Sequence, residues 1–122
     1  MISELKNLLS NSYAPYDYKC FACIVVMNDG TVFKGVTVKN AIFRDGIYAE
    51  QIAIARAVTK GYKYGDFDKL YLMVGTENIS DLKYLNERVI TEFFEPEKSV
   101  ILYTLNEDNR VLKVGNLYNN IY

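Results

Sequence analysis

Residues 47–61, IYAEQIAIARAVTKG, decide the fold of this chain. Good helix formers run through the segment, and several of its side chains are small and apolar. Lys60 and Gly61 close it, with a cation in the last turn and then the residue type that most often terminates a helix. We therefore expect a helix over residues 47–59. Glu50 would lie in its first turn, where a carboxylate suits the helix dipole and needs no other role.

A hairpin precedes this helix, and further strands follow it. Residues 21–27 form an apolar run, residues 28–30 (NDG) supply a turn, and residues 31–38 form a second β-rich run. The other expected elements are helices at residues 2–13 and 81–94 and strands at residues 70–74, 100–105 and 111–114. This order predicts an α/β fold, a three-layer α-β-α sandwich around one mixed sheet of about five strands.

Length and composition narrow the function classes. A chain of 122 residues fits one domain over residues 1–122. Its composition, with 50% hydrophobic and 24% charged residues, is ordinary for a globular protein. A net charge of -1 argues against a nucleic-acid partner, which usually meets a basic surface. No apolar run approaches the roughly 18 residues of a membrane span, and the start, MISELK, lacks a signal peptide's apolar stretch. We expect a cytoplasmic protein with no membrane partner.

The scarcity of histidine and cysteine limits the chemistry. The chain has no histidine, which excludes an imidazole base or ligand, and only two cysteines, Cys20 and Cys23. A structural zinc site needs four ligands, and side chains three apart on a strand point to opposite faces. A redox Cys-x-x-Cys pair normally begins a helix. Two small strand residues are therefore the favoured interpretation.

Five segments resemble motifs of the cytidine deaminase family, in the same order and with matching spacing. They are SYAPY at residues 12–16, NDGTVFKG at 28–35, KNA at 39–41, YAEQIAIARAVTKG at 48–61 and ERVITEF at 87–93. The resemblance covers nearly the whole chain. It implies a cytidine deaminase-like fold.

The resemblance also implies which residues occupy the family's zinc site. In the family, three cysteines, or one histidine and two cysteines, hold Zn²⁺, whose hydroxide attacks C4 of cytosine while a glutamate moves protons. Glu50 matches the glutamate, whereas the ligand positions hold Tyr48, Lys83 and Asn86. A phenol, an ammonium and an amide do not replace thiolates on zinc. We expect no zinc and no other cofactor.

The substrate-binding positions depart from the family as well. Where the family's Asn and Glu hold the ribose hydroxyls, this chain has Thr37 and Lys39, and only Asn40 of that segment is retained. A lysine ammonium cannot accept a hydrogen bond from a hydroxyl. The family's phenylalanine near the base falls at Lys19, beside Tyr18.

These matches and departures leave three possible functions. The chain is interpreted as a zinc-free relative of cytidine deaminase, without hydrolytic activity, that keeps the fold and either a vestigial nucleoside pocket or an interaction role. The alternative is a functional cytidine deaminase of pyrimidine salvage, turning cytidine or deoxycytidine into uridine or deoxyuridine at an unusual site. A third is a module for another small ligand.

Partners follow from the same resemblance. The small members of the family are homotetramers, which implies a homo-oligomer here, a tetramer or a dimer. Apolar and aromatic residues near the C-terminus and before the central helix fit an interface: Phe43, Tyr118, Ile121 and Tyr122.

The lost zinc site yields one structural prediction. Lys83 in a first helical turn opposes the dipole and needs an anion, so we expect an ion pair with Glu50. Tyr48 and Asn86 should hydrogen-bond around it, and Asp81 should cap the helix. The alternative is that Lys83 extends into solvent while Glu50 serves only the dipole.

Overall fold

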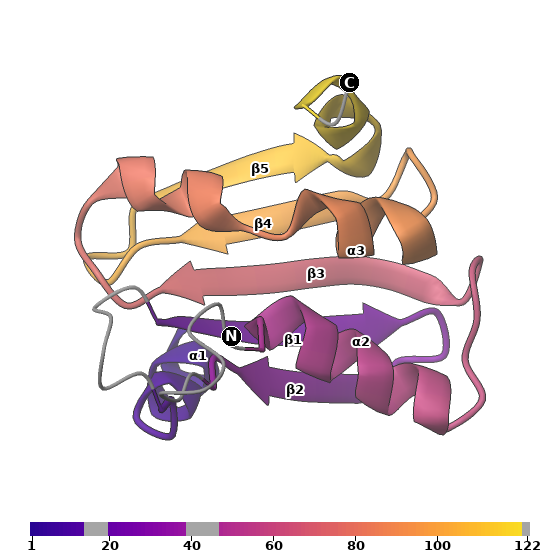
Figure 1. Ribbon diagram of the computed structural model, residues 1–122, viewed down its shortest axis with the longest axis horizontal. Coiled ribbons are helices and arrows are strands. Elements are labelled where there is room, and N and C mark those ends of the chain that lie inside the picture. The colour runs from indigo at the N-terminus through magenta and orange to yellow at the C-terminus, as the bar shows by residue number, and fades with distance from the viewer. Residues whose placement is uncertain (14–19, 39–46, 121–122) are drawn as a thin grey trace.

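The computed structural model describes residues 1–13, 20–38 and 47–120. Figure 1 shows one sheet with helices packed across it. In chain order the elements are α1 (Ile2–Leu9), β1 (Phe21–Met27), β2 (Val32–Val36), α2 (Ala49–Thr59), β3 (Phe67–Val74), η1 (Ile79–Tyr84), α3 (Glu87–Phe93), β4 (Ser99–Tyr103), β5 (Asn109–Lys113) and η2 (Val114–Asn120), where η marks a 3-10 helix. Within the described ranges, no helix is long and apolar enough to cross a membrane.

The sheet is mixed and has five strands in the order β2-β1-β3-β4-β5. β1 pairs antiparallel with β2 and β3, and β4 pairs antiparallel with β5. β3 and β4 are parallel, so the chain must cross over between them, and η1 and α3 make this connection. The expected mixed sheet of about five strands is therefore confirmed.

Helices lie on both faces of the sheet, as the three-layer prediction requires. α2 and α3 cover one face, where Cys23, Val25 and Leu70 belong to the larger apolar cluster (Figure 1). α1 covers part of the other face, where Leu5 packs with Ile24. Alternate side chains of β1 thus enter opposite clusters, and this explains why nearly the whole strand is apolar.

The β1–β2 hairpin forms where the turn chemistry predicts it. Gly30 has a φ of 88°, a conformation that glycine adopts without steric cost. The Asp29 Oδ1 atom accepts a hydrogen bond of 2.9 Å from the amide of Thr31, and Oδ2 accepts one of 2.7 Å from the Tyr62 hydroxyl. Asp29 therefore both shapes the turn and ties it to the segment after α2.

The contact between β2 and α2 depends on Gly35. A Cβ atom at Gly35 would lie 2.4 Å from the carbonyl oxygen of Ala49 and 2.7 Å from the amide nitrogen of Ala53. No side chain fits at those distances, so α2 lies directly on the backbone of β2. This contact holds the first turn of α2, which carries Glu50, against the sheet.

Two helix predictions were wrong in length. α1 ends at Leu9 rather than residue 13, because the hydroxyls of Ser10 and Ser12 donate to the carbonyls of Asn7 and Leu9. The helix expected over residues 81–94 is divided into η1 and α3 by extended backbone at Leu85. The break matters for the site because Asn86 follows it directly.

Candidate functional site

A buried carboxyl lies at the centre of the candidate site. Glu50, in the first turn of α2, is only 1% exposed. Its Oε2 atom accepts a hydrogen bond of 2.5 Å from the backbone amide of Asn86, whereas its Oε1 atom has no partner within the described part of the chain. Burial raises the pKa of Glu50 above its ordinary value, although hydrogen bonds from the backbone of Asn86 and of Glu50 itself act against the rise. This carboxyl can hold a proton at a higher pH than an exposed one.

Local sequence explains how Glu50 is placed. Tyr48 is the N-cap residue of α2, with extended backbone, and its amide donates to the side-chain Oε1 of Gln51 at 3.1 Å. Ala49 and Ala53 are fully buried, and their small size lets the helix approach β2 at Gly35. The carboxyl is consequently directed into the protein rather than into solvent.

Cys23 is a second buried ionisable group on this side of the sheet. It lies on β1 and is fully buried, and its thiol is free. Burial raises the pKa of Cys23 well above its ordinary value, and the negative charge of Glu50 raises it further. Cys23 is thus a neutral thiol near Glu50. The interpretation of the two cysteines as small strand residues holds for Cys23, whereas Cys20 precedes β1 and is half-buried.

The three positions matched to zinc ligands do not converge on Glu50 with their side chains. Tyr48 is 37% exposed at the start of α2. Lys83, in η1, is exposed, and its Nζ lies over the ring of Tyr84 at 5.2 Å from the ring centroid. Asn86 uses its side-chain Oδ1 to accept from the amide of Val89 at 3.3 Å, so that it caps α3.

The predicted ion pair between Lys83 and Glu50 is wrong. Oε1 of Glu50 has no described partner, and Oε2 is engaged by Asn86 through its backbone amide and not its side chain. The alternative expectation for Lys83, that its side chain extends into solvent, is confirmed because Lys83 is exposed. Because the expected helix breaks before Asn86, Lys83 lies in a separate 3-10 segment and not in the first turn of α3.

The predicted cap at Asp81 is also wrong. The N-cap of η1 is Asn78, whose side chain accepts from the amide of Ser80 at 3.0 Å. Asp81 instead accepts from the hydroxyl of Thr76 at 2.7 Å.

Of the positions matched to ribose binding, the structure describes Thr37. It is 3% exposed, and its hydroxyl accepts from the amide of Phe21 at 2.9 Å. Thr37 therefore ties the end of the hairpin to the start of β1. Lys39 and Asn40 lie outside the described residues, as do Tyr18, Lys19, Phe43, Ile121 and Tyr122.

The donor set around Glu50 does not fit zinc. Structural and catalytic zinc sites use at least three thiolate, imidazole or carboxylate ligands. Across residues 1–13, 20–38 and 47–120, no three His, Cys, Asp or Glu side chains gather to hold a metal ion. Glu50 supplies one carboxylate, and Cys23 is a thiol that burial keeps protonated.

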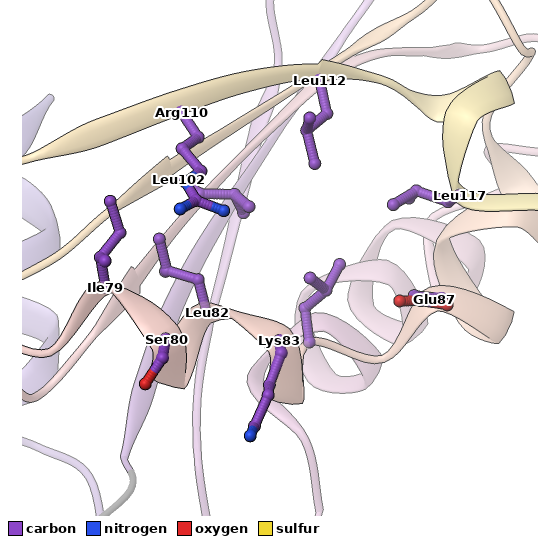
Figure 2. A pocket seen from close by; sticks show the side chains of 10 residues that line it. Ile79, Ser80, Leu82, Lys83, Glu87, Leu102, Arg110, Leu112 and Leu117 are labelled. Carbon is purple, nitrogen blue, oxygen red and sulfur yellow. The ribbon is translucent and has the colours of Figure 1, made fainter. Parts of the chain in front are cut away.

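Sequence reasoning missed a cavity lined in part by residues of η1. The cavity has a volume of about 500 Å³ and lies between η1, β4, β5 and η2. Figure 2 shows Arg110 among the side chains that line it. The alternation of β5 was a usable signal, because Arg110 and Leu112 fall on the same face of that strand.

Comparison with known proteins gives the family of the chain. Residues 4–83 match the family model of the cytidine and deoxycytidylate deaminase zinc-binding region. A cytidine deaminase of Mycoplasma genitalium is 31% identical over 81 residues, which cover 66% of this chain and 60% of that protein. A cytidine deaminase of Sporosarcina psychrophila is 26% identical over 117 residues, covering 96% of this chain and 85% of that protein.

Solved structures agree with the sequence relatives. The crystal structure of cytidine deaminase from Burkholderia pseudomallei has a TM-score of 0.80 at 29% identity, and the match covers 95% of this chain and 91% of that one. The cytidine deaminase structure from Mycobacterium leprae has a TM-score of 0.70 at 21% identity, covering 96% and 92%, and supports the fold alone. The order of elements, the five-stranded sheet and these matches together show that the chain belongs to the cytidine and deoxycytidylate deaminase family.

Proposed function

We propose that this chain is a zinc-free member of its family that does not hydrolyse cytidine. The observation that carries the proposal is the surroundings of the Glu50 carboxyl. Its oxygens meet backbone amides and no described cation. The side chains of Tyr48, Lys83 and Asn86 are a phenol, an ammonium and an amide, and none of them bonds this carboxyl. The fold and Glu50 remain, without a set of ligands for the metal.

The chemical reason is the acidity of water. Water bound to zinc in an enzyme has a pKa of about 7, against about 15.7 for bulk water. A carboxyl such as Glu50 can accept one proton, but it does not supply hydroxide at neutral pH by itself. We therefore expect the chain to carry out an interaction role or to bind a nucleoside without converting it.

The second candidate is a functional cytidine deaminase of pyrimidine salvage. Two observations favour it: burial raises the pKa of Glu50, as a proton-shuttling acid requires, and Oε1 has no described partner and is free to meet a substrate. The relatives that the chain resembles carry the name cytidine deaminase.

Metal content and product formation together distinguish the two candidates. The purified chain is incubated with Zn²⁺, desalted and measured for zinc by mass spectrometry, and uridine formation from cytidine is followed by chromatography. We expect no stoichiometric zinc and no uridine. Zinc bound at one ion per chain, with uridine formation that a chelator and Glu50→Gln both abolish, would establish the second candidate instead.

A thermal-shift series separates a nucleoside pocket from an interaction role. A ligand that binds only the folded state raises the melting temperature. Cytidine, deoxycytidine and uridine are compared with ribose as the control. A rise with the nucleosides alone would indicate a retained pocket, and no rise would leave the interaction role.

We also propose that the chain is a homo-oligomer in the cytoplasm. Tyr13, Ile47 and Tyr48 are large and exposed, and bridges from Val38 to Tyr13 and to Ile47 bring the first two together. Contiguous exposed apolar residues beside a site are typical of an interface. Sedimentation at micromolar concentration should give a dimer or tetramer, and a 14.0 kDa particle would contradict this proposal.

A further inference from the structure

We propose that the cavity between η1, β4, β5 and η2 binds a small monocarboxylate with an apolar body, and that Arg110 recognises the carboxylate. This inference does not depend on whether the chain deaminates cytidine, because Glu50 does not line the cavity. Its volume of about 500 Å³ lies in the range of small-molecule sites.

The lining of the cavity is mainly aliphatic. Six apolar side chains from β4, β5, η1, η2 and the segment between η1 and α3 face it: Ile79, Leu82, Leu85, Leu102, Leu112 and Leu117. Leu82, Leu102 and Leu117 are almost fully buried, so they form the floor of the cavity rather than its rim. An apolar ligand body would remove from water the leucine surface that faces the opening.

The positive charge of Arg110 on the cavity wall determines where the charged end of a ligand would bind. Figure 2 shows Arg110 extending from β5 toward Leu102, while Lys83 points away from the cavity. Arg110 forms no ion pair with an acid among the described residues, although Glu107 and Asp108 are close in sequence. A guanidinium presents two parallel N–H donors whose geometry matches a carboxylate.

Glu87 restricts the ligand further. It lies on the cavity wall beside Leu117, across from Arg110 in Figure 2. A second anionic group on the ligand would approach this carboxylate and be repelled. The arrangement therefore favours one negative charge, held at Arg110, and an uncharged apolar remainder.

Octanoate is the probe, and 1-octanol is the matched ligand without charge. Each is titrated into the ¹⁵N-labelled full chain while amide chemical shifts are recorded. We expect octanoate to shift amides of η1, β5 and η2 and to bind at least about tenfold more tightly than octanol, the usual order for a hydrogen bond to a charged group. Equal affinity for the two ligands, or no binding of octanoate, would overturn the proposal.

Two variants of β5 locate the interaction. Arg110→Gln should reduce octanoate binding about tenfold and leave octanol binding unchanged. Lys113→Gln is the control, because it removes the same charge from the opposite face of the strand, where Lys113 donates to Ser99 at 3.4 Å. Loss of octanoate binding in both variants to the same extent would show attraction by net charge and would contradict a site at Arg110.

Discussion

Glu50 combines almost complete burial with one carboxyl oxygen, Oε1, that has no hydrogen-bond partner among the described residues. A carboxyl whose pKa is higher in the folded than in the unfolded chain binds more protons when folded. The contribution of Glu50 to the free energy of unfolding therefore falls as pH rises from the ordinary glutamate pKa to the raised pKa of Glu50, and that contribution does not change further above this window.

Glu50→Gln should remove this pH dependence. Glutamine keeps an oxygen that can accept the amide of Asn86 and has no charge to desolvate. The free energy of unfolding, measured with urea at a series of pH values, should fall less steeply with pH than in the parent. Glu92→Gln, at an exposed position on α3, is the control and should retain the parental slope. An unchanged slope in Glu50→Gln would show that burial does not perturb this carboxyl.

The failed ion pair shows what sequence reasoning lacks at the scale of residues. The identity of Glu50 and its place in the first turn of α2 followed from the pattern around it, and both hold. The hydrogen-bond partner of Glu50 could not be predicted, because the donor is the backbone amide of Asn86. Every residue except proline has such an amide, so the residue type does not reveal which one donates. Likewise, no pattern along the chain indicates that Cys23 lies near Glu50 across the packed face.

Among the elements, α3 depends on a single side chain at its start. Asn86→Ala should remove the cap on the amide of Val89 and lower the free energy of unfolding by about 1 kcal/mol. Asn86→Asp retains an acceptor oxygen and should restore most of the loss. Urea denaturation of the three proteins measures both effects, and equal stability of all three would mean that the cap contributes nothing.

The packing of α2 on β2 gives a prediction about Gly35. Gly35→Ala places a methyl group within 2.4 Å of a backbone oxygen, so the helix must move, at a cost of about 1–3 kcal/mol. Gly75→Ala is the comparison, because its added Cβ meets no atom closer than 3.3 Å. Thermal denaturation should show a clearly larger loss at Gly35, and similar losses at both would contradict the tight contact.

Local signals explain which elements were predictable. The β1–β2 hairpin followed from Asn28-Asp29-Gly30, whose preferences are those of the turn itself. The division of residues 81–94 did not follow, because a helical pattern of apolar residues runs through both η1 and α3. The break is decided by competition, in which Asn86 caps a new helix more favourably than it continues an old one.

At the scale of the whole molecule, stability should be unequal across the sheet. β1 is hydrogen-bonded on both sides and buried on both faces, whereas β5 is an edge strand with mostly exposed residues. Hydrogen exchange should therefore be slowest in β1 and β3 and much faster in β5. Mass spectrometry of exchanged peptides measures this order, and equal protection of β5 and β1 would contradict it.

The close contact at Gly35 determines which positions near the start of α2 can be substituted without loss of the fold. The contact between β2 and α2 uses main-chain atoms and small alanines, so substitutions at Tyr48 or Lys83, which are exposed, leave it intact. Folding therefore constrains Gly35 and Ala49 more tightly than it constrains these two exposed positions.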